Sequence, residues 1–207
     1  MRNITTVLFD LGGVLIELGS LSEMMASSPH SDEDIWKGWT RSLSVRCYES
    51  GGCTSEEFAE NMVNEFKLSI TATEFIEKFR QWPKRTYPGA QSLLDNLSGK
   101  YRLACLSNTN HTHWEGFLCD QEIMACFSDV FLSHQTGVVK PDDAAFIHVL
   151  DNLGVSAEAI LFFDDNPGNV SAAKKMGMNA ECAKTPEGVI DALNELGANI
   201  WSDGPMW

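Results

Sequence analysis

Five short runs of apolar residues along the chain predict β-strands. The first four are nearly continuous rather than alternating, which is typical of strands buried on both faces of a parallel sheet. The runs span Thr6–Asp10, Arg102–Ser107, Val130–Ser133, Ala159–Asp164 and Asn179–Ala183. We therefore expect a parallel β-sheet at the centre of the fold.

Segments with helical periodicity separate these runs. Apolar residues recur at three- and four-residue spacing in Pro88–Ser98, Asp142–Leu153 and Pro186–Leu196, as on the buried face of an amphipathic helix. Strands that alternate with helices predict right-handed crossovers and helices on both faces of the sheet. The expected fold class is α/β, with a three-layer Rossmannoid core.

The stretch from residue 18 to residue 85 lacks a convincing strand and carries three helical patterns. These patterns are Ile35/Trp39/Leu43, Phe58/Met62/Phe66 and Phe75/Ile76/Phe79/Trp82. Ser31 and Asp34 resemble a capping pair, and Thr54 with Glu57 fits a capping box. We expect an all-helical cap at 18–85, inserted into a core made of 1–17 and 86–207.

Composition narrows the class of protein and its partners. The chain has 207 residues, 43% of them hydrophobic. This is enough for one globular domain, or one domain with an inserted subdomain, and too apolar for a disordered chain. It has 29 acidic against 15 basic residues, a formal net charge of −14. Such an acidic chain is a poor partner for nucleic acid or an anionic membrane. The oligomeric state stays open.

Cysteine usage and the chain's start bear on location. The six cysteines show neither a Cys-x-x-Cys pair nor zinc-ligand spacing, and Cys105 lies in an apolar run where it serves as a small hydrophobic residue. No run approaches the roughly 20 apolar residues of a membrane span. The first residues, Met1–Thr6, lack the apolar region of a signal peptide. The expectation is a cytoplasmic protein with reduced cysteines.

Polar residues stand at the ends of four predicted strands. Asp10 closes the first strand, Ser107 closes the second, Lys140 follows the third, and Asp164 with Asp165 closes the fourth. Open α/β sheets bind ligands at the carboxyl ends of their strands. These residue types suit phosphoryl transfer, in which Asp10 can be a nucleophile and the carboxylates hard oxygen ligands for Mg²⁺. Ser107 and Lys140 can donate to phosphoryl oxygens.

The four segments resemble, in order and position, the four motifs of the haloacid dehalogenase (HAD) superfamily, over essentially the whole chain. They are separated by 97, 33 and 25 residues (10 to 107, 107 to 140, 140 to 165), which leaves room for a helical C1-type cap after the first. More narrowly, they resemble the bacterial alpha-D-glucose-1-phosphate phosphatase subgroup. The segments are Phe9-Asp10-Leu11-Gly12, Leu106-Ser107-Asn108-Thr109-Asn110, Lys140-Pro141 and Phe162-Phe163-Asp164-Asp165-Asn166.

The resemblance implies a Mg²⁺-dependent phosphatase acting on a small phosphorylated metabolite. Asp10 would attack phosphorus and form an aspartyl-phosphate. Ser107 and Asn108 would hold the phosphoryl group, and Lys140 would stabilise its charge. The metal ligands would be Asp10, the backbone carbonyl of Gly12, Asp164 and Asp165. The proposed core carries a net charge of −11, so we expect poor phosphate binding without the metal.

Gly12 departs from the pattern of most phosphatases of this superfamily. They carry a second Asp there, a general acid and base typically worth about 10²- to 10⁴-fold in rate. The subgroup named above also resembles this chain in having Gly. We expect a substrate with a good leaving group, a sugar phosphate such as glucose 1-phosphate. The alternatives are a phosphomutase, a 2-haloacid dehalogenase, or a catalytically weak protein that binds a phosphorylated metabolite.

Several other residues are open to two interpretations. His111 and His113 can reach a substrate or lie on the surface at a helix start. The tail from Ile200 to Trp207 can dock on the core or on a neighbour. For two further groups we favour a structural role over contact with substrate. Core packing is expected for the tryptophans Trp36, Trp39 and Trp82, and exposed helix charges are expected for Arg41, Arg46 and Glu49.

Overall fold

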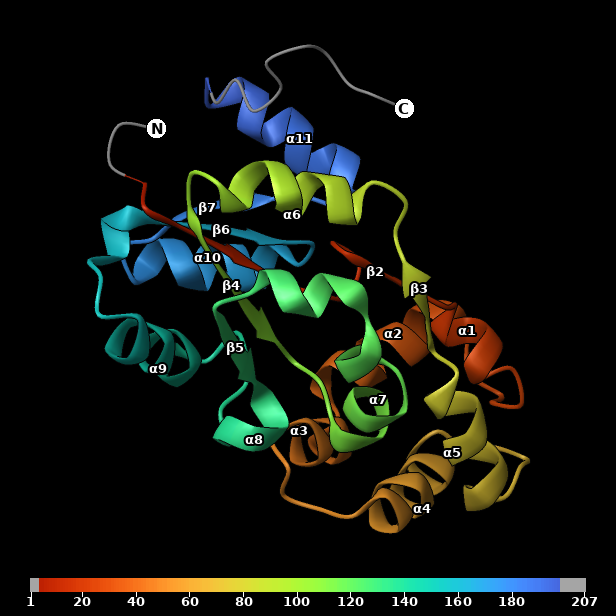
Figure 1. The fold of residues 1–207 in the computed structure, drawn as a ribbon. Helices are drawn as coiled ribbons and strands as arrows, with labels where there is room; N and C mark the ends of the chain where they lie inside the picture. Colours follow the sequence, from red (N-terminus) through yellow and green to blue (C-terminus); the bar gives the residue numbers. More distant parts are fainter. Residues whose placement is uncertain (1–3, 198–207) are drawn as a thin grey trace.

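A five-stranded parallel sheet forms the centre of the protein in the computed structural model, which describes residues 4–197 (Figure 1). The strand order is β5-β4-β1-β6-β7, so the first strand lies in the middle. The strands are β1 (Thr6–Phe9), β4 (Arg102–Ser107), β5 (Asp129–Leu132), β6 (Ile160–Asp164) and β7 (Asn179–Cys182). The predicted parallel sheet is therefore confirmed.

Burial along the strands follows their place in the sheet. β1 and β6 are buried throughout, because both have neighbours on each side and helices on each face. β5 is an edge strand, and Val130 is 36% exposed, so the prediction of burial on both faces is wrong for β5. This strand ends at Leu132, and the residue predicted to end it, Ser133, begins a short helix.

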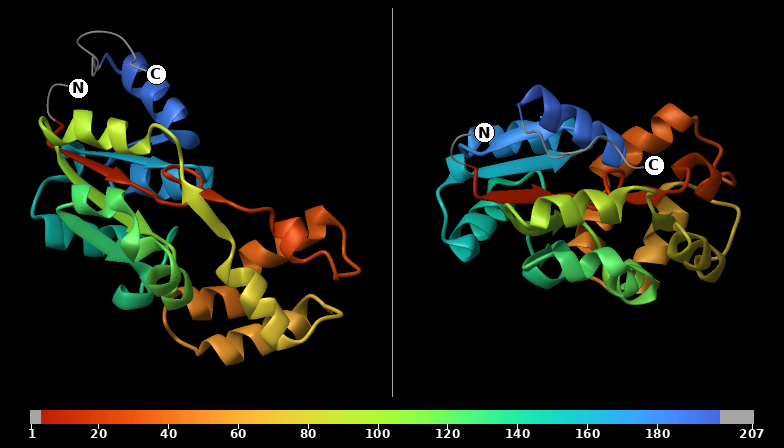
Figure 2. Two further views of the ribbon diagram at one scale, coloured as in Figure 1. Left: turned by 45° about the vertical axis from the view of Figure 1, so that its right-hand side comes forward. Right: turned by 45° about the horizontal axis from the view of Figure 1, so that its top comes forward.

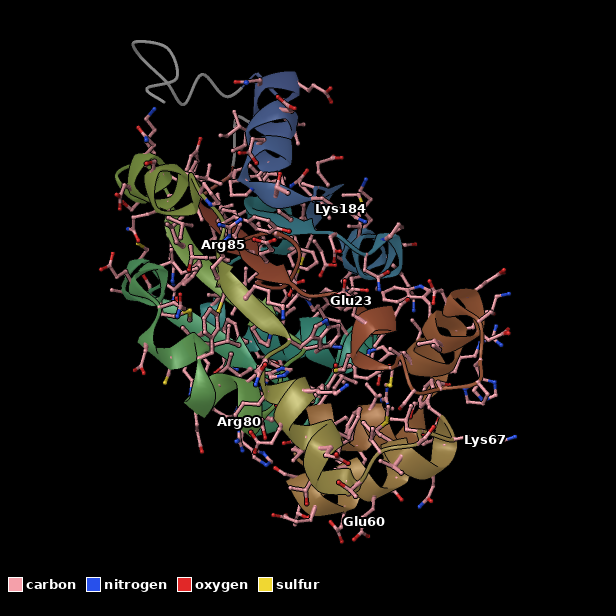
Figure 3. The ribbon with its side chains drawn as sticks, turned by 90° about the vertical axis from the view of Figure 1, so that its right-hand side faces the viewer. Glu23, Glu60, Lys67, Arg80, Arg85 and Lys184 are labelled. Carbon is pink, nitrogen blue, oxygen red and sulfur yellow. The ribbon has the colours of Figure 1, made fainter. Side chains whose placement is uncertain are left out.

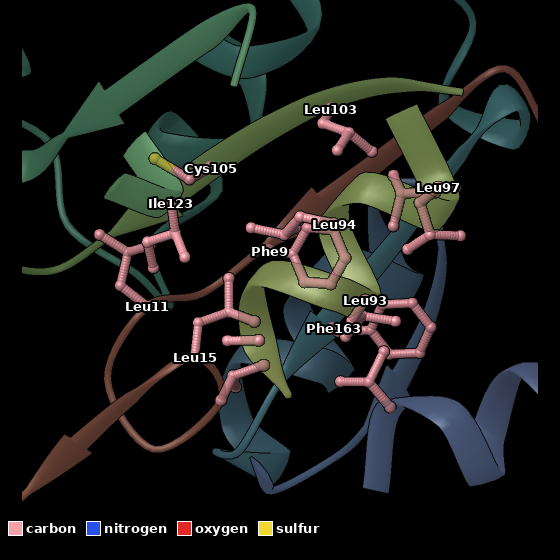
Figure 4. Close-up of a cluster of buried hydrophobic side chains, with 14 of the residues drawn as sticks. Phe9, Leu11, Leu15, Leu93, Leu94, Leu97, Leu103, Cys105, Ile123 and Phe163 are labelled. Carbon is pink, nitrogen blue, oxygen red and sulfur yellow. The ribbon is translucent and has the colours of Figure 1, made fainter. Parts of the chain in front are cut away.

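Helices cover both faces of the sheet and complete three layers (Figure 2). On one face, Val7 and Phe9 pack against α6 (Ala90–Ser98) and α11 (Thr185–Glu195), in the cluster that Figure 4 shows. On the other face, Leu8 packs with α9 (Asp143–Leu153) and α10 (Pro167–Lys175). Alternate residues of β1 thus serve opposite layers, as the pleat of a strand requires. Cys105 is fully buried in the first cluster, as predicted.

A helical segment lies between the first and second strands of the core, joined to it by a two-stranded antiparallel ribbon of β2 (Ile16–Leu18) and β3 (Pro83–Thr86). We call residues 19–82 the insertion. Its helices are α1 (Leu21–Met24), α2 (Asp32–Arg41), α3 (Leu43–Glu49), α4 (Ser55–Glu65) and α5 (Ala72–Arg80). The expectation of no strand within 18–85 is wrong at the margins. Two central residues of β3 are exposed and charged, so β3 has no apolar run to predict it.

The insertion has a hydrophobic cluster of its own, dominated by aromatic rings. Tyr48 stacks on Phe58 with ring centroids 4.3 Å apart, and Phe79 meets Phe58 edge to face at 5.0 Å. The capping box predicted at Thr54 is present, with both reciprocal hydrogen bonds. Charged side chains such as Glu60 and Lys67 point away from this cluster (Figure 3). The domain limits 1–17, 18–85 and 86–207 stay a prediction.

Short helical turns complete the chain between β4 and β6. These are α7 (His111–Gly116), η1 (Leu118–Asp120), η2 (Glu122–Cys126), α8 (Ser133–Thr136) and η3 (Ala157–Ala159). Within residues 4–197 no helix is long and apolar enough to cross a bilayer. The apolar tail from Ile200 to Trp207 lies outside the described residues.

Candidate active site

The carboxyl ends of three neighbouring strands bring the predicted site residues together. β1 lies between β4 and β6, with Phe9 in register with Cys105 on one side and Phe163 on the other. Asp10 continues β1 by one residue, and its backbone N–H donates to the carbonyl of Phe163 at 2.8 Å. Ser107 and Asp164 thus lie at the same edge as Asp10, although they are 97 and 154 positions away from it in sequence.

Lys140 is the positive centre of this edge. Its Nζ lies 2.9 Å from Oδ1 of Asp10 and 2.7 Å from Oδ2 of Asp164, and its side chain is only 1% exposed. Burial alone would lower the pKa of this lysine, but the two carboxylates outweigh burial and raise it. Lys140 is therefore charged at neutral pH, and its charge is directed at the predicted nucleophile.

Asp10 is buried, with 8% of its surface exposed. Burial raises the pKa of Asp10 to about 7; Lys140 opposes this shift, while Asp164 and Asp165 add to it. A further positive charge placed beside this carboxylate would stabilise its charged form. The nucleophile predicted from sequence is thus held at a site that favours a bound cation.

Asp164 is fully buried, and three donors make four contacts with its two oxygens. Lys140 and the backbone N–H of Asn166 donate at 2.7 and 2.8 Å, and Nδ2 of Asn169 lies 3.0 Å from each oxygen. Asn169 stands on the first turns of α10 and is itself buried. Nothing in the sequence marks Asn169 as a site residue, because an Asn five positions after an Asp carries no signal of its own.

Three carboxylates form a candidate metal site. Asp10, Asp164 and Asp165 each offer an oxygen within 4.8 Å of the others, the one such group among the described residues. Burial, then the nearby Asp164, raises the pKa of Asp165. Hard oxygen donors and an excess of carboxylates over the single Lys140 fit a divalent cation such as Mg²⁺. The residues present therefore suit the predicted metal.

The turn after β1 provides the room for Asp165. Gly13 has φ +74°, and a Cβ there would lie 2.7 Å from Oδ2 of Asp165. Any other residue would be strained and would push this carboxylate away. Gly12 lines the same pocket through its backbone, and its predicted role as a carbonyl ligand stays a prediction.

The loop after β4 is fastened to the segment that carries Lys140. Oδ1 of Asn108 accepts from the backbone N–H of Lys140 at 2.8 Å, and its Nδ2 donates to the carbonyl of Lys140 at 2.9 Å. The side chain of Asn108 thus positions Lys140, and its predicted contact with a phosphoryl group stays a prediction. Ser133, which sequence analysis missed, holds the next residue, Thr109, through two hydrogen bonds of 2.9 Å.

A pocket of about 320 Å³ lies between this edge and the insertion. Asp10, Ser107, Lys140 and Asp165 line its floor, and aromatic side chains of the insertion line its walls. Ser107 is 3% exposed at the end of β4. A pocket of this size, with polar groups on one side and aromatic rings on the other, suits a small polar ligand.

The three tryptophans differ in burial, but all of them lie at the pocket. Trp39 is 7% exposed and packs in the insertion's cluster, as expected, and Trp82 packs partly against that cluster. The core expectation is wrong for Trp36, which is 56% exposed on α2. All three line the pocket, so a residue can serve both packing and a ligand.

The histidines and charged residues also take different roles. His113 is buried against Phe79 and lines the pocket, while His111 lies 3.3 Å from Ser55 of the insertion. Arg46 pairs with Asp142 of the core, so it joins the two parts rather than only facing solvent. Glu49 is half-buried and lines the pocket, contrary to the expectation of an exposed helix charge. Arg41 is exposed, as expected.

Relatives of the chain include enzymes with several activities. A protein named phosphatase MT3486 from Mycobacterium tuberculosis is 26% identical, over 98% of this chain and 100% of its own length. A phosphorylated carbohydrates phosphatase from Thermotoga maritima is 23% identical, over 91% and 87%. Drimenol cyclase drtB from Aspergillus calidoustus is 26% identical over 86% of this chain, which spans only 33% of that protein. An (S)-2-haloacid dehalogenase from Pseudomonas, at 25%, fits the dehalogenase alternative only loosely.

Solved structures share the fold over most of the chain. A protein described as a predicted HAD-like family hydrolase from Porphyromonas gingivalis superposes with a TM-score of 0.76 at 27% identity, covering 94% of this chain and 98% of that one. A HAD family enzyme from Bacteroides thetaiotaomicron, in complex with magnesium and inorganic phosphate, gives a TM-score of 0.72 at 23% identity, covering 87% and 94%. The profile of the haloacid dehalogenase-like hydrolases matches residues 4–177, and the chain belongs to that family of hydrolases.

Proposed function

We propose that the protein is a Mg²⁺-dependent phosphatase that hydrolyses a small phosphomonoester through an aspartyl-phosphate at Asp10. The observation that carries the proposal is the buried cluster in which Lys140 contacts both Asp10 and Asp164, with Asp165 beside them and a pocket in front. Phosphatases among the relatives support the same reaction class.

Each residue at the sheet edge has a role in this reaction. Asp10 attacks phosphorus, and the bond from phosphorus to the leaving oxygen breaks, which releases the leaving group and leaves the phosphoryl group on Asp10. Water then attacks the phosphorus, the bond from Asp10 to phosphorus breaks, and inorganic phosphate is released. Lys140 stabilises the negative charge that moves between Asp10 and the phosphoryl oxygens, and Ser107 donates to one of them. Neither residue needs a large movement to do so, because both already line the pocket.

The carboxylates of Asp10, Asp164 and Asp165, with the carbonyl of Gly12, would hold Mg²⁺. Bound there, the cation supplies positive charge that allows an anionic phosphate to approach an anionic nucleophile. Within the chain itself, Asn169 and Lys140 fix the orientation of Asp164, and Gly13 leaves the space that Asp165 occupies.

The substrate we propose is a sugar phosphate, with glucose 1-phosphate as the leading candidate. A 320 Å³ pocket with Trp36 and Trp82 in its walls offers flat aromatic surfaces for a sugar ring. The absence of a carboxyl group at Gly12 favours an anomeric oxygen, which leaves more readily than an ordinary alcohol.

A phosphate-release assay tests the proposal. We expect purified protein to release phosphate from glucose 1-phosphate faster than from glucose 6-phosphate, with Mg²⁺ and not after EDTA. Asp10→Asn should abolish release, while Asp151→Asn, at an exposed position of α9, should retain it. No release from any phosphorylated metabolite, with ligand-induced thermal stabilisation, would identify a binding protein instead. EDTA-resistant dehalogenation of 2-haloacids would identify a dehalogenase.

A further inference from the structure

One carboxyl group of the insertion lines the pocket that holds the nucleophile. Glu49 is the last residue of α3, on the insertion, and it lines the same pocket as Asp10, Ser107 and Lys140. Its Oε2 lies 3.4 Å from Nδ2 of Asn108, a long hydrogen bond at best. Among the ion pairs of residues 4–197 none includes Glu49, although Arg46 stands one turn before it and pairs with Asp142. The carboxyl group is therefore available to a ligand.

Contacts of two residues just before Glu49 fix the end of α3 against the core. The ring of Tyr48 stacks on Phe58, and its hydroxyl bonds to Ser55 at 2.8 Å and to Thr112 of the core. Arg46 makes its two-point contact with Asp142, at the start of α9. Arg46 and Tyr48 both lie within three positions of Glu49 in sequence. They hold its carboxyl group over the site without using it.

The leaving oxygen of the substrate needs a proton donor, and none of the residues at the sheet edge has that role. Position 12 has no side chain, so no carboxyl group follows Asp10 at that spacing. An attacking and a leaving oxygen lie roughly in line on opposite sides of the phosphorus. Since Asp10 attacks from the sheet edge, the leaving oxygen points toward the insertion, where Glu49 lies.

The surroundings of Glu49 suit both giving and taking a proton. Burial raises the pKa of Glu49 to about 7; Lys140, Asn108 and Arg46 oppose this shift, and Asp10 adds to it. A group with a pKa near the working pH is populated in both protonation states, which is what acid–base catalysis requires.

We propose that Glu49 is a catalytic residue that protonates the leaving oxygen and then activates the water, in place of the carboxyl group absent at Gly12. In the first step the bond from Asp10 to phosphorus forms, the ester bond breaks, and the proton of Glu49 moves to the leaving oxygen. In the second step water attacks phosphorus, the bond to Asp10 breaks, and one water proton returns to Glu49. Glu49 thus ends each cycle protonated. The inference rests on the proposed phosphatase function.

The test compares two esters in Glu49→Gln, a change that keeps the size of the side chain and an oxygen that can accept from Asn108. Glucose 1-phosphate, or the best sugar phosphate found for the wild-type protein, needs a proton donor for its leaving group. p-Nitrophenyl phosphate does not, because nitrophenolate leaves unprotonated. Glu60→Gln, at an exposed position of α4, is the matched control.

With the sugar phosphate, we expect Glu49→Gln to lower the rate of phosphoenzyme formation by about 10²- to 10⁴-fold. With p-nitrophenyl phosphate it should show a burst of nitrophenol at close to the wild-type rate, followed by slow turnover, because water then lacks its base. The burst amplitude counts folded active sites, so a partly misfolded variant still gives an answer. Glu60→Gln should match the wild-type protein throughout.

Two results would overturn the inference. Equal loss with both esters and no burst would show that Glu49 only binds or positions substrate, and wild-type rates in Glu49→Gln would show that it takes no part. A wild-type protein that releases no phosphate from either ester would instead refute the proposed function. The two failures are therefore distinguishable.

Discussion

Protonation of His113 should cost the folded protein stability in mildly acidic solution. His113 is 6% exposed, and its ring stacks on Phe79 with centroids 4.1 Å apart. Nε2 lies 2.7 Å from the carbonyl of Phe79, which can only accept, so Nε2 carries the proton. Asn110 accepts through Oδ1 from the backbone N–H of His113, so its Nδ2 faces Nδ1 of the ring at 3.2 Å. A second ring proton on Nδ1 would meet a donor.

The size of the effect follows from the pKa. Burial lowers the pKa of His113 from 6.5 to about 4, and the carbonyl of Phe79 only partly opposes this. Between these values the unfolded chain binds a proton that the folded chain does not, so stability falls as the pH falls from 6.5 toward 4. At about 1.4 kcal/mol per pH unit, His113 should contribute roughly 2 kcal/mol less at pH 5 than at pH 8.

Urea unfolding at pH 8, 7, 6 and 5, followed by tryptophan fluorescence, measures this contribution. The quantity to compare is the free energy of unfolding of the wild-type protein minus that of His113→Gln. Subtraction removes the titration of other groups, including Asp10 and Glu49, whose raised pKa values act in the opposite direction. We expect the difference to shrink by roughly 2 kcal/mol between pH 8 and pH 5. His30→Gln, at an exposed position, should show no such trend, and a constant difference for His113→Gln would refute the reasoning.

Three further variants test other contacts by chemical or thermal unfolding. Lys140→Met should lose activity and about 3–5 kcal/mol of stability, because it leaves Asp10 and Asp164 buried without a cation; unchanged stability would contradict this. Thr54→Ala should cost about 1 kcal/mol by removing the capping box of α4, and a loss above about 2 kcal/mol would contradict that assignment. Arg46→Ala should cost about 1 kcal/mol or less, because its ion pair is half-exposed; a cost of several kcal/mol would refute a surface role.

Local patterns were enough to predict the sheet and its polar edge. β1, β4 and β6 are buried almost throughout, so their apolar runs carry the strand signal, and the polar residue that ends each run marks the edge. Three helices of the insertion, α2, α4 and α5, were predicted for the same reason, since each buries an apolar face. The first pattern ran too far, because α2 ends at Arg41 and Leu43 is 80% exposed. By contrast, β3 is short, and its two central residues are exposed and charged, so it has no apolar run. Its partner β2 is distant in sequence, since Ile16 pairs with Thr86, 70 residues later (16 to 86), and no local pattern reports such a pairing.

Roles set by tertiary burial could not be read from the sequence. By their spacing in sequence, Glu49 and His113 are ordinary helix residues. They line the pocket only because α3 of the insertion and α7 of the core lie where the two parts meet. Trp36 and Trp39 share one helix, yet one is mostly exposed and the other is buried. Gly13 illustrates the same limit. A side chain does not fit there because Asp165, which follows a different strand, occupies the adjacent space.

The most direct test of the central claim is to trap the phosphoenzyme and locate its phosphate. Protein mixed with Mg²⁺ and a phosphorylated substrate would be quenched in acid within milliseconds, reduced with borohydride, digested and mapped by mass spectrometry. Reduction should convert position 10 to homoserine, with no such product in Asp10→Asn. Turnover with no homoserine at position 10, or with the phosphate trapped on another residue, would contradict the assignment of Asp10 as the nucleophile.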